Sequence, residues 1–291
     1  MAITKETRLF AAEQADRLLS RLAFQLNRTI KSHDADQVHD LRVAIRRFTQ
    51  ALIAFQPCFP RREVRTIRRR LKKIMVLAGD VRNCDIAMKL LSKLKVPASI
   101  AVLREFRNKR KEAEQPFLGS LKRWVARRSS SRWRAGLETA AAAKGFCHRS
   151  IHDTAKRTLS GMMKDFFIRG GEAAARKAAP EQLHQFRLAA KRLRYTLELF
   201  APLYGPSVNA ILEQIKSVQT YLGAVNDCET VRSMVEGYRD SEEIDAALKR
   251  KQRRLTAEFR RRWAETYSHP DTLHRWMRNL NHFAVRRRLA A

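Results

Sequence analysis

Residues 38–60 read VHDLRVAIRRFTQALIAFQPCFP, and residues 183–205 read LHQFRLAAKRLRYTLELFAPLYG. The two stretches align without a gap, and each places one histidine three residues before an arginine. A match of this length indicates an internal duplication, so the fold of the first stretch is expected again in the second. The matched polar positions are His39 with His184, Arg42 with Arg187, Arg46 with Lys191 and Arg47 with Arg192.

Each copy has the periodicity of an amphipathic helix. At about 100° per residue, its apolar positions fall on one side and its histidine and cations on the opposite side. The buried side is predicted to consist of Leu41, Ile45, Phe48, Leu52 and Phe55 in the first copy, and of Phe186, Ala190, Leu193, Leu197 and Phe200 in the second. The polar side is predicted to consist of His39, Arg42, Arg46 and Gln50, and of His184, Arg187, Lys191, Arg194 and Tyr195.

A second pair of matching stretches follows the first. LKKIMVLAGDVRNCDIAMKLL at 71–91 aligns with IKSVQTYLGAVNDCETVRSMV at 215–235. The distance from the first motif is nearly the same in both halves, which favours duplication of a whole unit. The glycines in these stretches are expected to interrupt a helix or to allow close packing. The matched positions include Lys72 with Lys216, Gly79 with Gly223, Cys84 with Cys228 and Asp85 with Glu229.

The duplication predicts two repeats, at 1–130 and 146–291, that together form one domain. The boundary is expected within 126–146, which holds two arginines, three serines, an alanine run and a glycine.

The sequence predicts an all-α fold. Glycine and proline are scarce, and no alternation of apolar and polar residues requires a sheet. Long helices with short loops indicate two pseudo-symmetric antiparallel four-helix bundles, related by a pseudo-two-fold axis. The helices are expected at roughly 4–31, 36–55, 61–93, 98–127, 147–170, 180–201, 206–239, 241–267 and 270–287.

Charge points to an anionic partner. Lysine and arginine number 60 against 29 aspartates and glutamates, which gives a net charge of +31. Such an excess is costly in a compact chain and is typical of proteins that bind nucleic acid, an anionic membrane or a polyphosphate. No apolar run approaches the ~20 residues of a membrane span, so no membrane partner is expected. The cysteines (Cys58, Cys84, Cys147 and Cys228) are expected to be reduced and mostly buried in a cytoplasmic protein.

The polar side of each repeated helix suits a linear phosphate polymer. Cations at positions i, i+3 and i+7 span about 10 Å of helix, and both arginine and lysine bind phosphate oxygens. For His39 and His184 three roles stay open: contact with phosphate, structural capping, or metal ligation across the two repeats. Asp40 is not repeated, because Gln185 takes its place, which argues against a catalytic Asp–His pair.

Other polar residues are interpreted as structural. Asn83, Asp85, Asp227 and Glu229 are expected to cap a helix and to pair with arginine from a neighbouring helix. His148 and His152 have the spacing of metal ligands on one helix face, but the first repeat has no matching pair. No Walker A loop, GxSxG or HExxH motif is present. We therefore expect no catalytic residues, no metal and no cofactor.

The paired motifs HDLRVAIRRF…LAGDVRNCDI and HQFRLAAKRLRY…LGAVNDCE resemble the CHAD domain, the conserved histidine α-helical domain. The resemblance covers nearly the whole chain and implies two four-helix bundles around a basic cavity or pore that binds inorganic polyphosphate, with bacterial members on polyphosphate granules. Asn83 departs from the acidic residue of the family pattern, and the Glu-x-Glu-x-Lys signature of a fused triphosphate-hydrolysing domain is absent. The implied polyphosphate-binding residues are His39, Arg42, Arg46, Arg47, His184, Arg187, Lys191, Arg192 and Arg194, with Lys72, Arg82, Lys216, Arg17 and Arg157 as weaker candidates.

Two other functions remain open. A nucleic-acid-binding protein has the same charge and needs exposed aromatic residues for stacking, whereas most aromatic residues of this chain fall on predicted core positions. A metal-dependent phosphohydrolase would use the histidines and acids. Competition between polyphosphate and DNA, and an assay for phosphate release, separate these functions from polyphosphate binding on granules in the cytoplasm.

Overall fold

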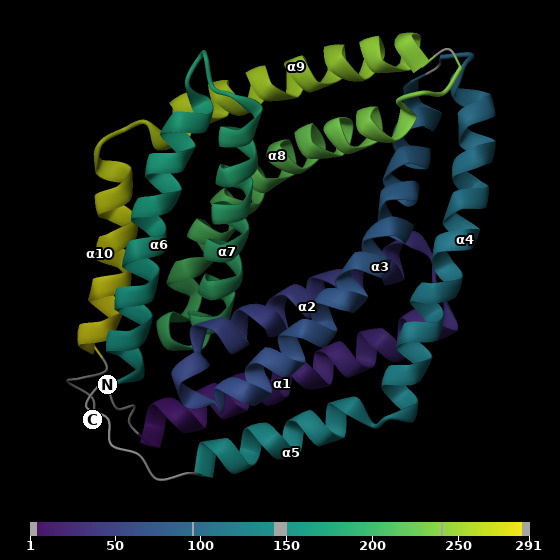
Figure 1. Ribbon diagram of the computed structural model, residues 1–291. Helices are drawn as coiled ribbons and strands as arrows, with labels where there is room; N and C mark the ends of the chain where they lie inside the picture. The colour runs from purple at the N-terminus through teal and green to yellow at the C-terminus, as the bar shows by residue number, and fades with distance from the viewer. Residues whose placement is uncertain (1–4, 95, 143–149, 240, 287–291) are drawn as a thin grey trace. The chain divides into compact units, whose positions relative to one another are not determined.

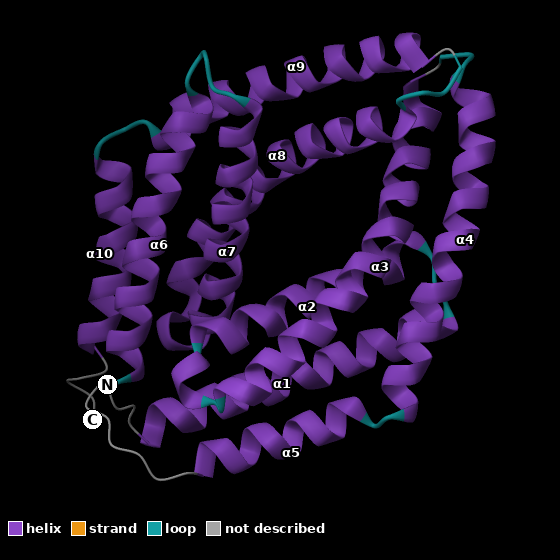
Figure 2. Ribbon diagram, viewed as in Figure 1, coloured by secondary structure: helices purple, strands orange, loops and turns teal. Residues whose placement is uncertain are grey.

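The computed structural model describes residues 5–94, 96–142, 150–239 and 241–286 (Figure 1). The described residues form helices joined by short turns and contain no strand (Figure 2). The all-α prediction is therefore confirmed. The chain divides into two compact units: unit 1 comprises residues up to 150 together with 231–245, and unit 2 comprises 151–230 together with 246–291. A pseudo-two-fold relation between the repeats stays a prediction.

Unit 1 is built from five successive helices and the chain segment 231–245. Helix α1 packs on α2 and α5, and α3 packs on α2 and α4. The predicted apolar side of the first motif lies in the core, because all five of its residues are at most 1% exposed. The elements are α1 (Lys5–Lys31), α2 (Ala35–Ala54), the short 3-10 helix η1 (Gln56–Cys58), α3 (Arg61–Leu94), α4 (Ser99–Ala126) and α5 (Ser129–Ala142).

Helix α5 corrects the predicted linker. The stretch 126–146 was expected to separate two repeats, but Ser129–Ala142 is helical. Its apolar residues pack on unit 1, since Trp133 is 5% exposed and its ring lies 4.4 Å from the ring of Trp124 in α4. The alanine run favours helix, and two buried apolar side chains, Trp133 and Leu137, give it a face to bury.

Unit 2 has a core rich in aromatic rings. Phe166 of α6 contacts Phe186 of α7 at a centroid distance of 5.0 Å and Trp276 of α10 at 5.5 Å. The predicted apolar side of α7, the second copy of the histidine motif, is completely buried. The elements are α6 (Ile151–Ala174), α7 (Pro180–Tyr204), the 3-10 helix η2 (Gly205–Val208), α8 (Asn209–Val235), α9 (Ser241–Tyr267) and α10 (Asp271–Arg286), of which the last turn of α8 and the start of α9 belong to unit 1.

In the stretches 71–91 and 215–235, the helix-interruption alternative for the glycines and the capping role of the polar residues were wrong. Gly79 and Gly223 lie inside α3 and α8, and the helices continue through them, because one glycine costs only about 1 kcal/mol in a long helix. The polar residues that follow are also inside these helices, so they do not cap them. On the polar side of the first motif, Gln50 and Tyr195 are buried instead of exposed.

Three of the four cysteines are described. Cys58, Cys84 and Cys228 are buried and reduced, as predicted, whereas Cys147 lies outside the described residues. Among the described helices, none combines the length and apolar character that a membrane span requires.

Candidate anion-binding site

Arg42 of α2 extends across the surface of α3. Its Nη1 donates a hydrogen bond to the backbone carbonyl of Met75 at 3.0 Å. Gly79 lies one turn further along α3, and a Cβ atom at this position would sit 3.3 Å from the same nitrogen. Gly79 therefore leaves room for the guanidinium, which confirms the close-packing alternative for this glycine. The half-buried Arg42 is held in one place before any ligand arrives.

His39 lies in a positive field. Partial desolvation lowers the pKa of its imidazole, and the charges of Arg82, Arg46 and Arg42 lower it further, partly offset by Asp40. These predicted site residues are thus close enough to act on one another. A neutral imidazole among cations donates one hydrogen bond and accepts another, and it gains a proton readily when an anion approaches.

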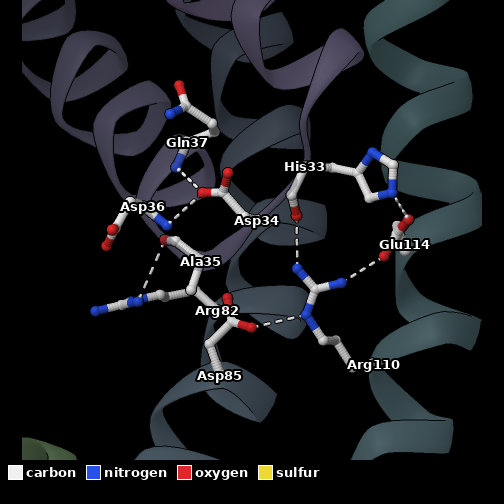
Figure 3. Close-up of polar contacts among 9 residues, drawn as sticks. All are labelled: His33, Asp34, Ala35, Asp36, Gln37, Arg82, Asp85, Arg110 and Glu114. Carbon is white, nitrogen blue, oxygen red and sulfur yellow. Dashed lines mark hydrogen bonds and ion pairs between the residues drawn. The ribbon is translucent and has the colours of Figure 1, made fainter.

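A polar network holds the start of α2 in place (Figure 3). Asp34 is its N-cap: a carboxylate oxygen accepts hydrogen bonds from the backbone N–H groups of Asp36 at 3.0 Å and Gln37 at 2.9 Å. These bonds, that to Gln37 first, lower the pKa of Asp34. Arg82 of α3 donates to the carbonyl of Ala35 at 3.4 Å. The predicted ligand Arg82 is thus also an anchor between α3 and α2.

Arg110 of α4 completes this network (Figure 3). Its Nε donates to Asp85 Oδ1 of α3 at 2.7 Å, and its Nη2 donates to the carbonyl of His33 at 2.6 Å. Glu114 accepts a further bond from Arg110 and pairs with His33 Nε2 at 2.6 Å. Burial raises the pKa of Asp85 although Arg110 opposes the shift. The expected pairing of Asp85 with an arginine of a neighbouring helix is therefore confirmed.

In unit 2 the second copy of the histidine motif, on α7, lines a cavity of about 350 Å³. His184 and Arg187 of α7 lie on one wall, and Arg253 and Arg260 of α9 lie on another. Glu229 of α8 also lines it and accepts a hydrogen bond from Gln252 at 3.1 Å. Three arginines and one histidine at one cavity create a strongly positive site that suits phosphate oxygens.

Arg260 carries an unused donor at this cavity. Its Nε is buried and has no hydrogen-bond partner among the described residues. A buried N–H without an acceptor costs about 1–3 kcal/mol, so such atoms in folded proteins call for an explanation. An anion bound in the cavity would supply the missing acceptor.

The remaining predicted residues are dispersed. Arg192 lies 3.9 Å from Asp165, Arg194 stacks on the ring of Tyr195 at 4.8 Å, and Lys216 pairs with Glu213 at 2.6 Å. None of the three lines the cavity of unit 2. Arg47 and Lys191 are half-buried on the motif helices, Lys72 and Arg157 are exposed on α3 and α6, and Arg17 is exposed on α1, where it donates to Gln14 at 2.7 Å.

Sequence reasoning missed the cations of the fourth long helix in each half. In unit 2, Arg253 and Arg260 of α9 line the same cavity as His184. In unit 1, a cavity of about 870 Å³ beside Arg110 and Asp85 is lined by cations of α4, namely Arg104, Arg107 and Lys111. Both sets have the i and i+7 spacing that identified the motif helices. The same pattern, applied to α4 and α9, would have found them.

No metal site is apparent in the described parts of the chain, where no group of three or more histidine, cysteine or carboxylate side chains is placed to hold an ion. His152 lies in α6, whereas its predicted partner His148 lies outside the described residues.

Comparisons with known proteins identify the fold. A family model described as the CHAD domain matches residues 13–236. The crystal structure of the CHAD domain from the plant Ricinus communis is similar with a TM-score of 0.63 and 20% identity, covering 97% of this chain and 94% of that chain. PptA from Streptomyces chartreusis is similar with a TM-score of 0.56 and 16% identity, covering 87% of this chain and 98% of that chain. No curated protein matches the chain.

Proposed function

Because the chain belongs to the CHAD domain family, we propose that it binds inorganic polyphosphate through the His/Arg/Lys faces of α2 and α7. Each face combines a histidine with cations on a helix whose opposite side is buried. A polymer with one negative charge in every phosphate unit matches such a row of cations, and it gains affinity through many weak contacts and the release of counterions.

The cavity of unit 2 carries this proposal. It places His184 and Arg187 of the repeated motif beside Arg260, whose buried Nε has no acceptor among the described residues. A solvated basic surface does not leave a buried donor unpaired, because water satisfies its cations. An anion bound beside His184 and Arg187 would accept a hydrogen bond from this donor, and this is why the cavity is the centre of the proposed site.

We further propose that the protein binds without catalysis. Recognition of phosphate by arginine and histidine needs neither a nucleophile nor a metal ion. A binder of this kind accumulates where its polymer is concentrated, which leads us to propose attachment to polyphosphate granules in the cytoplasm.

Nucleic acid is the second candidate ligand, and one observation favours it. Phe24 of α1 is 53% exposed and lies between Arg21 and Arg28, whose guanidinium carbons are 6.0 and 5.8 Å from the ring centroid. An exposed aromatic ring flanked by cations is a stacking position for a base. Against it, the aromatic residues of both motifs are buried, so this one ring stands apart from the motif helices.

A competition experiment separates the two ligands. We expect polyphosphate to bind more tightly than duplex DNA at equal phosphate concentration and physiological salt, because the repeated faces concentrate cations in rows. Equal or tighter binding of DNA would contradict polyphosphate as the ligand. Release of phosphate from polyphosphate by the purified protein would contradict a purely binding function.

A matched pair of variants tests the site. Arg260→Gln removes the unpaired donor, and Arg261→Gln removes an equal charge from an exposed neighbour on α9. We expect the first to weaken polyphosphate binding about tenfold, as the loss of a charge-assisted hydrogen bond does, and the second to have little effect. Equal losses in both variants would show that the cavity is not the binding site.

A further inference from the structure

A further basic cavity lies in unit 1, where α4 ends and α5 begins. The junction of these two helices is visible in Figure 1. Its volume is about 290 Å³, at the lower end of the range of small-molecule sites. Arg70 and Lys73 of α3 line one side, and Arg123 and Arg127 at the end of α4 line the other. None of these residues is among the predicted polyphosphate-binding residues, and no acidic residue is among those that line the cavity.

No carboxylate of the described residues forms an ion pair with these four cations. Among the described residues, no ion pair, side-chain hydrogen bond or aromatic contact engages Arg70, Lys73 or Arg127, and Arg123 makes no ion pair. Like charges gathered at one place repel one another, and solvent screens part of this repulsion because Lys73, Arg123 and Arg127 are exposed. An anion in the cavity removes that repulsion.

The start of α5 adds hydrogen-bond donors to the same cavity. The first N–H groups of a helix have no acceptor within it and carry the positive end of the helix dipole. Ser129, the first residue of α5, lines the cavity and is 2% exposed. A buried hydroxyl, a helix start and four cations thus meet at one place.

The corner is held in shape by specific contacts. Trp124 Nε1 donates to Ser130 Oγ at 2.9 Å, and the rings of Trp124 and Trp133 pack edge to face at an interplanar angle of 77°. Between the two helices, Arg128 has a φ of 47°. Among the described residues other than glycine, it is the only one with a positive φ. A non-glycine residue in this region costs about 1–3 kcal/mol, and such strain concentrates at functional sites.

We propose that this cavity binds a compact di- or triphosphate group. Its volume of about 290 Å³ suits a group of this size, and its cations, hydroxyl and backbone donors match the several oxygens and negative charges of such a group. The site is separate from the helix faces to which long polyphosphate was assigned above. A free oligophosphate and the phosphates of a nucleotide share this chemistry.

Calorimetric titration of the full chain with sodium triphosphate tests the proposal. The variant Arg123→Gln with Arg127→Gln removes the α4 side of the cavity, and Arg70→Gln with Lys73→Gln removes the α3 side. The control, Arg275→Gln with Arg278→Gln, removes two exposed charges from α10. Because Arg123 and Arg127 are exposed, we expect that variant to unfold at the same temperature as the wild type; if it does not, the α3 variant replaces it.

We expect triphosphate to bind each cavity variant at least about tenfold more weakly than the control, with long polyphosphate little affected. If the cavity variants and the control bind triphosphate with equal affinity, whether high or low, the cavity is not the binding site. Loss of long-polyphosphate binding in the motif variants is a separate result and bears on the function proposed above. Titrations with pyrophosphate and ATP identify the source: tighter binding of ATP, lost in the cavity variants, assigns the site to a nucleotide.

Discussion

Under the proposed function, His39 couples the binding of polyphosphate to the binding of protons. Partial desolvation and the neighbouring arginines hold its pKa below the ordinary value of about 6.5. A bound phosphate chain would bring negative charge to the imidazole and raise that pKa again. The complex then binds more protons than the free protein, so affinity rises as the pH falls.

We therefore predict that polyphosphate affinity increases as the pH is lowered from about 8 to about 6. Titration calorimetry at fixed ionic strength measures it. The His39→Gln variant should show a flatter pH profile, and comparison with it removes any contribution from the terminal phosphates of the polymer. Identical profiles for wild type and variant would mean that His39 does not lie near the ligand.

At the scale of elements, the packing of α6 on α9 depends on a missing side chain. Gly170 of α6 is buried against Trp263, and a Cβ atom there would lie 1.8 Å from the indole ring. Gly171, the next residue of the same helix, is exposed and has open space around its Cβ position. Two adjacent glycines thus occur in the same helix for different reasons.

We predict opposite effects of the same substitution at these glycines. Gly170→Ala should destabilise the protein by about 1–3 kcal/mol through overpacking. Gly171→Ala should stabilise it by about 0.4–1 kcal/mol, because alanine restricts the unfolded chain and favours helix. Urea unfolding measures both. A destabilisation of similar size in both variants would contradict this account of the α6–α9 contact.

The long helices were predictable from the sequence, but the turn between α4 and α5, and α5 itself, were not. The apolar period of each motif identifies its buried face from local information alone, and Leu41 and Phe200 lie where that period puts them. Helix α5 was missed because serines, arginines and alanines resemble a linker until Trp133 is seen against Trp124. That contact depends on a turn at Arg128 that residue types do not specify.

The candidate site was predictable to a similar degree. The repeat identified the motif residues of α2 and α7, because duplicated cations stand out from single ones. Arg253 and Arg260 have the same i, i+7 spacing, but the spacing alone does not show that α9 turns this face toward His184 and Arg187, because tertiary packing decides it. Nor did the repeat show that Arg127 belongs to a cavity shared by three helices.

For the whole molecule, net charge and a built site are competing explanations of anion binding. A chain of net charge +31 attracts any polyanion, so affinity alone does not distinguish them. Two variants of equal charge do. One replaces the motif residues Arg42, Arg46, Arg187 and Lys191 with alanine. The other replaces the exposed residues Arg61, Arg62, Arg275 and Arg278 with alanine, two from each unit.

We predict that the motif variant loses tight polyphosphate binding, whereas the control is weakened only modestly. Both should remain folded: the motif variant loses the bond from Arg42 to Met75, worth about 1 kcal/mol, and gains relief from repulsion. Log affinity should fall linearly with log salt between about 50 and about 200 mM. The slope should be steeper in the control than in the motif variant, because the motif variant makes fewer phosphate contacts and therefore releases fewer counterions when it binds. Equal affinities and equal salt slopes in the two variants would make net charge, and not the repeated faces, the cause of binding.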